Sequence, residues 1–383
     1  MPGLDAAQLA QSATVRSALH GVLAKRGGWL PFDEYLQLVL YAPGLGYYSA
    51  GAAKLGAAGD FTTAPELSPL FGGCVARQCA PLLRGGGDVL ELGAGTGALA
   101  AAVLLRLEAL GALPANYYIL EVSADLRARQ QQRVLQLPAV LRSRVRWLDA
   151  LPAVPLRGAI LANEVADALP FQCFTVTADG YRERGVGLDG HGELAWEERA
   201  ATPALRAELA RIADALPMAW APGYRGELCV RAGGWLAGVA AALEAGIMLL
   251  FDYGLGRQEL YHPQRDAGTL QCHYRHRAHG DPFLYPGLQD ITAWVDFTRL
   301  AEAASDAALE VAGYCTQAAF LLGAGLDAEL GAAAEGLERA RLVSQARQLL
   351  LPGEMGETFK ALALTRDADC PPAFTVQDLR RLL

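Results

Sequence analysis

The apolar residues of this chain form short runs, separated by segments with apolar residues at helical spacing. The runs predict five strands, at residues 89–90, 117–120, 144–148, 158–162 and 247–251. The first two strands are each followed by a predicted helix, at 98–111 and 123–135. Strands that alternate with helices are typical of a parallel α/β sheet, whose ligand site lies at the carboxyl ends of the strands.

Other patterns flank these strands. Helical spacing predicts helices at 5–25, after Pro31, at 70–83, at 203–216 and at 233–245. Residues 171–196 alternate around Ala178-Asp179-Gly180, which predicts an antiparallel hairpin inserted beyond the fourth strand. Apolar runs at 312–322 and 359–365 predict an antiparallel pair that closes the sheet edge.

The first strand runs into Glu91-Leu92-Gly93-Ala94-Gly95-Thr96-Gly97 and then into the first of these helices. Glycines allow a sharp turn and a close approach of a ligand to the backbone. Gly93-x-Gly95-x-x-Ala98 also fits a dinucleotide fingerprint, and a ligand-free turn is a third interpretation. Glu91 favours S-adenosylmethionine, because a carboxylate would repel a pyrophosphate and could bind an ammonium group.

Polar residues follow the other parallel strands at the same predicted edge. Glu121 ends the second strand, where an acid can bind both hydroxyls of an adenosine ribose or simply cap a helix. Asp149 follows the third strand, and Asn163-Glu164 the fourth. Glu164 and Asp167 could share one face of a helical turn and face the cofactor. Alternatively, they could be a helix cap and a solvent-exposed acid with no role in binding.

Composition narrows the class of protein. The chain has 383 residues, a formal net charge of −8 and 52% hydrophobic residues, which argues against disorder and against nucleic-acid binding. Its seven cysteines include no Cys-x-x-Cys pair, which is typical of reduced thiols in a cytosolic protein. We expect a cytoplasmic protein without membrane insertion, and the Ala, Leu, Gly and Arg content suggests a bacterial source.

A histidine-rich segment invites a metal hypothesis. His273, His276 and His279 are three residues apart, which spreads them over too wide an arc of a helix for one ion. Because partner ligand motifs are missing, we expect no metal here, and a loop that contacts an anionic or polar group instead.

Several segments together resemble one family. They are Gly46-Tyr47-Tyr48-Ser49, residues 59–66, the Glu91–Gly97 turn, Asn163-Glu164-x-x-Asp167, Asp252-Tyr253-Gly254, Asp281-Pro282 through Pro286-Gly287, Asp290 to Phe297, and Gln317 to Leu321. They are similar to the MidA-like methyltransferases, which include the mitochondrial complex I assembly factor that methylates arginine. The match spans nearly the whole chain in order.

The resemblance implies a fold and a domain division. The fold would be α/β, with a seven-stranded Rossmann-like class I methyltransferase sheet. Residues 1–85 would form a helical cap and a cofactor-covering loop, and 86–383 the methyltransferase domain with an insertion at about 171–245. The methyl donor would be S-adenosyl-L-methionine.

The resemblance also implies site residues. The cofactor would contact Phe61 and Thr62 of the covering loop, the turn from Glu91 through Gly93, Ala94, Gly95, Thr96 and Gly97, and also Glu121, Val122, Asp149 and Asn163. We expect Glu164 to be the main clamp on the methyl acceptor, Asp167 the second, and Glu66 an outside candidate. Val165-Ala166 and Trp294 depart from the pattern of relatives, so the substrate could differ.

The function implied is a protein-arginine N-methyltransferase that acts on a partner protein of the respiratory complex I subunit type. Two alternatives stay open: a methyltransferase of a small molecule or another residue, and a cofactor-binding assembly factor with little catalysis. The insertion could be a homodimer surface or a substrate platform, and both predict an exposed apolar patch.

Overall fold

The computed structural model describes residues 3–49, 62–332 and 335–383. The chain divides into two compact units. Unit 1 contains Asp167–Ala232, Gly256–Asp296 and the described residues that precede Thr62. Unit 2 contains Thr62–Ala166, Gly233–Leu255 and the described residues of Phe297–Leu383.

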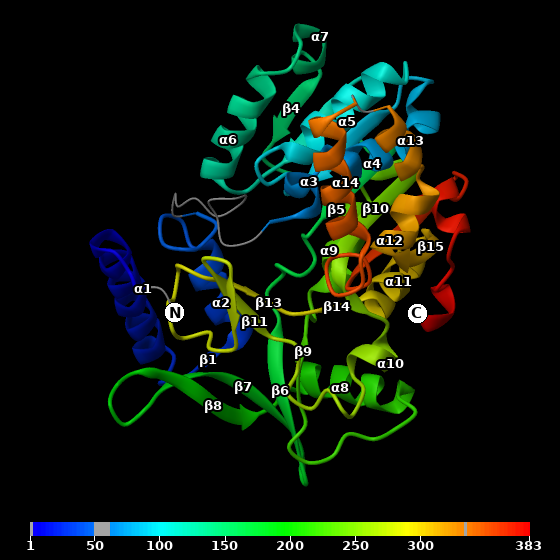
Figure 1. The fold of residues 1–383 in the computed structure, drawn as a ribbon. Helices are drawn as coiled ribbons and strands as arrows, with labels where there is room; N and C mark the ends of the chain where they lie inside the picture. Colours follow the sequence, from blue (N-terminus) through cyan, green and yellow to red (C-terminus); the bar gives the residue numbers. More distant parts are fainter. Residues whose placement is uncertain (1–2, 50–61, 333–334) are drawn as a thin grey trace. The chain divides into compact units, whose positions relative to one another are not determined.

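Unit 2 is built on one mixed sheet (Figure 1). Its strand order is β15 (Glu310–Thr316), β16 (Phe359–Arg366), β10 (Leu243–Leu255), β5 (Leu156–Asn163), β2 (Asp88–Leu92), β3 (Tyr117–Leu120) and β4 (Val145–Leu148). The strands from β10 to β4 are parallel, while β16 is antiparallel to both β10 and β15. This arrangement confirms the predicted Rossmann-like sheet. The strand order reverses between β2 and β5, which is where a sheet of this kind binds its ligand.

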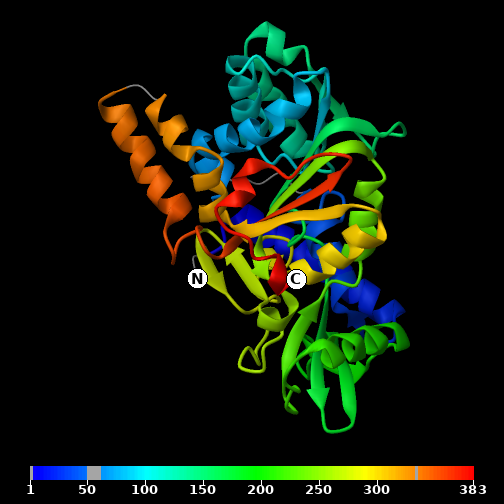
Figure 2. The same cartoon turned by 90° about the vertical axis from the view of Figure 1, so that its right-hand side faces the viewer.

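Helices flank the sheet of unit 2 or pack on the helices that do so (Figures 1 and 2). They are α3 (Ala64–Leu67), α4 (Pro69–Leu83), α5 (Ala98–Ala109), α6 (Ala124–Leu135), α7 (Ala139–Arg142), α9 (Ala232–Ala240), α11 (Phe297–Asp306), α12 (Gln317–Gly323), α13 (Leu326–Gly331) and α14 (Leu337–Leu350). The core joins strand and helix side chains: Phe251 of β10 packs edge-on against Phe71 and Phe320, with ring centroids 5.0 and 4.8 Å apart. Such pairs add to the hydrophobic stabilisation of the sheet.

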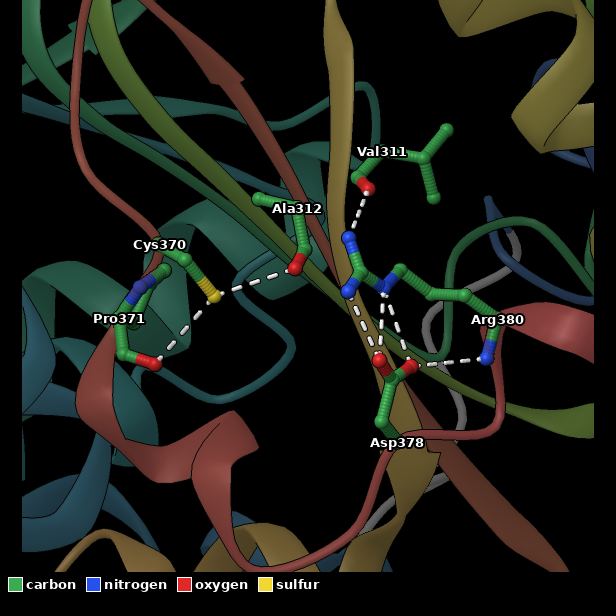
Figure 3. A network of polar contacts seen from close by, with 6 residues as sticks. All are labelled: Val311, Ala312, Cys370, Pro371, Asp378 and Arg380. Atoms are coloured by element: carbon green, nitrogen blue, oxygen red, sulfur yellow. Dashed lines mark hydrogen bonds and ion pairs between the residues drawn. The ribbon is translucent and has the colours of Figure 1, made fainter.

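The edge strand β15 is covered by the C-terminal segment (Figure 3). Arg380 donates a hydrogen bond to the Val311 carbonyl at 3.3 Å, and Asp378 accepts from the same guanidinium at 2.7 Å. The Cys370 thiol contacts the Ala312 carbonyl at 3.1 Å. Covering an edge in this way keeps its backbone groups from pairing with another chain.

Unit 1 contains the N-terminal helices and the predicted hairpin. Helices α1 (Ala6–Lys25) and α2 (Phe32–Tyr41) accompany a sheet in which β1 (Leu30–Pro31), β7 (Gly180–Leu188), β6 (Gln172–Thr177) and β9 (Arg225–Leu228) are neighbours, and β8 (Leu194–Ala200) pairs with β7. A second sheet contains β11 (Gln271–Tyr274), β12 (Arg277–His279) and β13 (Asp290–Thr292), and α8 (Pro203–Ala215) and α10 (Arg257–Leu260) complete the unit. Phe32 packs against Tyr35, Phe171 and Trp196 in its core.

Three expected elements differ from the structure. The helix expected at 233–245 ends at Ala240, because Leu243 already pairs with Leu156 of the neighbouring strand. The apolar run at 312–322 is a strand and then a helix, since the Thr316 hydroxyl accepts from the Ala319 amide and starts α12. The histidine segment expected as a loop forms the hairpin of β11 and β12.

Across the described parts of the chain, none of the helices combines the length and the apolar content that a membrane span requires.

Two glycines set the spacing of the central strands. Gly158 of β5 lies opposite Asp88 of β2 and Gly246 of β10, and both glycines have positive φ angles, 141° and 136°. A Cβ on Gly158 would lie inside the van der Waals radius of the Asp88 carbonyl oxygen. We therefore expect Gly158→Ala to lower the free energy of unfolding of unit 2 by about 2–4 kcal/mol, from overpacking and backbone strain.

The measurement is the denaturant midpoint, together with the melting temperature. Gly238→Ala is the control, because Gly238 lies exposed in α9 with open space around it, and alanine there should be neutral or slightly stabilising. Equal effects of the two substitutions would contradict this explanation.

Candidate active site

The glycine turn between β2 and α5 has the backbone that its sequence predicts. Gly93, Gly95 and Gly97 have φ angles of 59°, 54° and 85°, a region that other residues rarely adopt. The Gly93 amide donates to the Leu120 carbonyl at 3.0 Å, and the Gly97 amide to the Ala94 carbonyl at 2.7 Å. Gly97 is also the residue from which α5 starts. The turn is thus fixed to β3 at one end and to a helix N-terminus at the other.

Glu91 lies one strand position before the turn and is buried, with 2% of its surface exposed. The Tyr117 hydroxyl donates to its carboxylate at 2.6 Å. Burial raises the pKa of Glu91 to about 7; the nearby Glu121 carboxylate adds to the rise, and the Tyr117 hydrogen bond opposes it. A buried acid of this kind is stabilised in its ionised form by a neighbouring cation.

Glu121 follows β3, and both of its carboxylate oxygens are held by the start and the middle of α6. The Ser123 amide donates to one oxygen and the Gln130 side chain to the other, each at 2.9 Å. Burial raises the pKa of Glu121, against the effect of these hydrogen bonds. The side chain of the next residue, Val122, is 82% exposed and accessible to a ligand.

Gln130 is a site residue that the sequence analysis missed. Its buried amide donates to the Gly95 carbonyl at 2.9 Å as well as to Glu121, and it accepts from the Trp147 indole at 3.0 Å. Leu126 and Val134, one helical turn away on either side, are the other buried residues of α6. A glutamine at the helical spacing of the buried apolar residues was the sequence signal that could have identified Gln130.

Asp149 follows β4 and forms an ion pair with Arg127 at 2.5 Å. Its side chain is 88% exposed, so this pair contributes little to stability.

Glu66 of α3 lies against the glycine turn. Its carboxylate accepts from the Thr96 hydroxyl and pairs with Arg133 of α6 at 3.4 Å. Glu66 thus connects the segment before α4 with both the turn and α6.

Glu164 has a strained backbone. Its φ angle is 54°, although it is not glycine, and its amide donates to the Phe251 carbonyl of β10 at 2.8 Å. The Asn163 side chain donates to the Glu164 carboxylate at 3.0 Å. Such a conformation costs about 1–3 kcal/mol and persists only where the surrounding structure imposes it.

The segment after Glu164 is held by Asp252, which lies in β10, three residues before the strand ends at Leu255. The buried Asp252 carboxylate accepts from the Ala166 amide at 2.9 Å. Residues 164–170 form bends and one turn, so the expected helical turn carrying Glu164 and Asp167 is wrong, because the positive φ of Glu164 lies outside the right-handed helical region.

The predicted residues fall into three groups. Unit 2 holds Glu66, Glu91, the glycine turn, Glu121, Val122, Asp149, Asn163, Glu164 and the exposed Thr62. Asp167 is buried in unit 1. Phe61 lies outside the described residues. Among the residues that the structure describes, no group of three His, Cys, Asp or Glu side chains could hold a metal ion.

Known proteins resemble this chain along its whole length. The model of a family of S-adenosyl-L-methionine-dependent methyltransferases matches residues 74–315. A COG1565 superfamily member from Burkholderia thailandensis, solved with S-adenosyl-homocysteine bound, is 42% identical over 100% of both chains, with a TM-score of 0.94. The mitochondrial protein arginine methyltransferase NDUFAF7 of Danio rerio is 29% identical over an alignment of 373 residues that covers 89% of this chain and 84% of the relative.

The burial of Glu91 predicts proton release when an ammonium-bearing ligand binds beside it. With a pKa of about 7, Glu91 is mostly protonated at pH 6, and a neighbouring cation lowers that pKa. We expect S-adenosyl-homocysteine to release close to one proton at pH 6, and its affinity to rise with pH between about 5 and 7. Calorimetry at pH 6 in buffers of different ionisation enthalpy measures the number of protons released on binding.

Glu91→Gln supplies the control, because it keeps the shape of the side chain and cannot release a proton. The same proton release in the variant and in the wild type would show that Glu91 is not the group involved.

Proposed function

Because this chain belongs to the S-adenosyl-L-methionine-dependent methyltransferases, we propose that it is a protein-arginine N-methyltransferase. Its family, its enzyme class and its cofactor agree with the resemblance seen in the sequence. Support for arginine as the acceptor comes from relatives named protein arginine methyltransferases, at 27–29% identity. The observation that carries the proposal is the strained Glu164, at the carboxyl end of β5 in the unit that contains the glycine turn.

We assign the cofactor to the carboxyl ends of β2 and β3. The three glycines adopt positive φ angles and carry no Cβ, which leaves room for a close approach to the backbone. Glu91 would bind the ammonium group, Glu121 the ribose hydroxyls beside Val122, and Asp149 the adenine amino group. Ala94, Thr96, Asn163, Phe61 and Thr62 would complete this site. When bound, the cofactor supplies an electrophilic methyl group on a sulfonium that is its own leaving group.

The protein's task is then to hold and deprotonate the acceptor. A guanidinium is a poor nucleophile while it is a cation, and a carboxylate can hold its planar fork and take up the proton. We assign this role first to Glu164 and then to Asp167. Glu66 ranks last, since its carboxylate already pairs with Arg133 and an acceptor cation would compete with that pair.

The partner in this proposal is a protein, of the respiratory complex I subunit type that the sequence resemblance implies, and the compartment is the cytoplasm. We propose the segment at about 171–245 as the platform for this substrate or for a second copy of the chain. Leu188 and Met218 are exposed large apolar residues within it.

Glu164→Gln tests the acceptor clamp. We expect methyl transfer to fall at least 100-fold, because an amide cannot take up the proton, while the affinity for S-adenosyl-homocysteine stays within a few-fold. Single-turnover rates and calorimetry measure the two quantities. Asp149→Asn is the matched control, since it should weaken cofactor binding more than the transfer step. Wild-type turnover in Glu164→Gln would remove Glu164 from the mechanism.

Labelling identifies the acceptor. Purified protein is incubated with radiolabelled S-adenosylmethionine and lysate from a strain that lacks the gene. We expect one labelled protein band that is absent with Glu164→Gln, with the label on arginine after hydrolysis. Label on another residue or only in small molecules would support a methyltransferase of another specificity. No label, with tight cofactor binding retained, would support an assembly factor with little catalysis.

A further inference from the structure

We propose that Gln130 is a positioning residue for the cofactor site, which it controls by fixing the Glu121 carboxylate against the glycine turn. This inference rests on the role proposed above for Glu121. It assigns to α6 a function in ligand binding that is separate from the packing of that helix.

All hydrogen-bonding groups of the Gln130 amide are engaged. Its nitrogen donates to the Gly95 carbonyl and to the Glu121 carboxylate, and its oxygen accepts from the Trp147 indole. The side chain is completely buried. Because both acceptors lie on the nitrogen side and the donor on the oxygen side, the network permits one orientation of the amide. Gln130 therefore joins the ends of β2, β3 and β4.

Gly97 lies next to Gln130 in this network. A Cβ at Gly97 would lie 3.4–3.6 Å from the Cα, Cγ and Cβ atoms of Gln130, which is the near limit of van der Waals contact. The φ angle of Gly97 is 85°, a conformation that favours glycine. The third glycine of the motif thus sets the backbone conformation of the turn where α6 packs against it.

Helix α6 determines the position of both Glu121 oxygens. Its N-cap residue, Ser123, donates its amide to one oxygen and accepts from the Leu126 amide through its hydroxyl. Gln130, almost two turns later, donates to the other oxygen. Each carboxylate oxygen can accept more than one hydrogen bond, so this arrangement leaves capacity for two ligand hydroxyls. A carboxylate held at both oxygens loses little rotamer entropy when a ligand binds.

The test is the affinity for S-adenosyl-homocysteine, measured by calorimetry. Gln130→Met keeps the volume of the side chain and removes the amide, which leaves the Trp147 N–H without its acceptor and Glu121 without one donor. We expect affinity to fall about 10- to 100-fold, the range for a lost hydrogen bond to a charged group. The control is Gln131→Met, on the exposed side of the same helix, with unchanged affinity expected.

A double-mutant cycle with Glu121→Gln separates positioning from general stability. If Gln130 acts through Glu121, Gln130→Met should have little further effect in the Glu121→Gln background. Losses that add in the double variant, or wild-type affinity in Gln130→Met, would overturn the positioning role. Wild-type affinity in Glu121→Gln alone would instead overturn the ribose assignment on which this inference rests.

A second variant covers the case in which Gln130→Met does not fold. Gln130→Glu keeps the shape and the acceptor for Trp147, but it places a carboxylate against the Gly95 carbonyl and Glu121. We expect a larger loss of affinity than in Gln130→Met, and unchanged affinity would contradict the proposal.

Discussion

The polar edge of unit 2 at the carboxyl ends of β2 and β3 depends on the close approach of α6 to the glycine turn. That approach places Gln130 beside Gly97 and brings its buried amide within hydrogen-bond distance of the turn and of Glu121. The same helix carries Arg133, which pairs with Glu66 behind Thr96. One helix thus determines where several polar groups of this edge lie. A displacement of α6 would move all of these groups.

Three carboxylates lie along this edge, and their partners differ in charge. Tyr117 is a neutral donor to Glu91, and Ser123 and Gln130 are neutral donors to Glu121, whereas Arg133 is a cation beside Glu66. Neutral donors orient a carboxylate and leave its charge uncompensated, which favours the binding of a cationic or hydroxyl-bearing ligand. Burial raises the pKa values of Glu91 and Glu121, as expected for acids whose charge lacks a counter-ion. This difference supports the proposed cofactor roles of Glu91 and Glu121, and a structural role for Glu66 in connecting α3 with the turn and α6.

Much of this architecture follows from local sequence, and the remainder depends on tertiary contacts. The strand, glycine turn and helix at 88–109 could be predicted because short apolar runs, glycines and helical spacing each determine their own conformation. The start of β10 at Leu243 could not be predicted, since pairing with β5 extends the strand into an alanine-rich stretch with helical propensity. Gln130 was missed because its partners come from three strands that only the fold brings together. The conformation of Glu164 was also hidden, as glutamate carries no signal for a positive φ angle.

The strain at Glu164 is explained by the two strands that flank it. The Glu164 amide donates a hydrogen bond to the Phe251 carbonyl. Two residues later, the Ala166 amide donates to the Asp252 carboxylate, so β10 fixes the backbone from Glu164 to Ala166 at both ends. β10 and β5 are neighbours at the centre of the sheet, and Phe251 is anchored by the rings of Phe71 and Phe320. The core therefore imposes a conformation that the residue would not adopt by itself. A fixed backbone limits the positions that the Glu164 side chain can reach, and in the role proposed for Glu164 it would present the carboxylate to the acceptor with little loss of entropy.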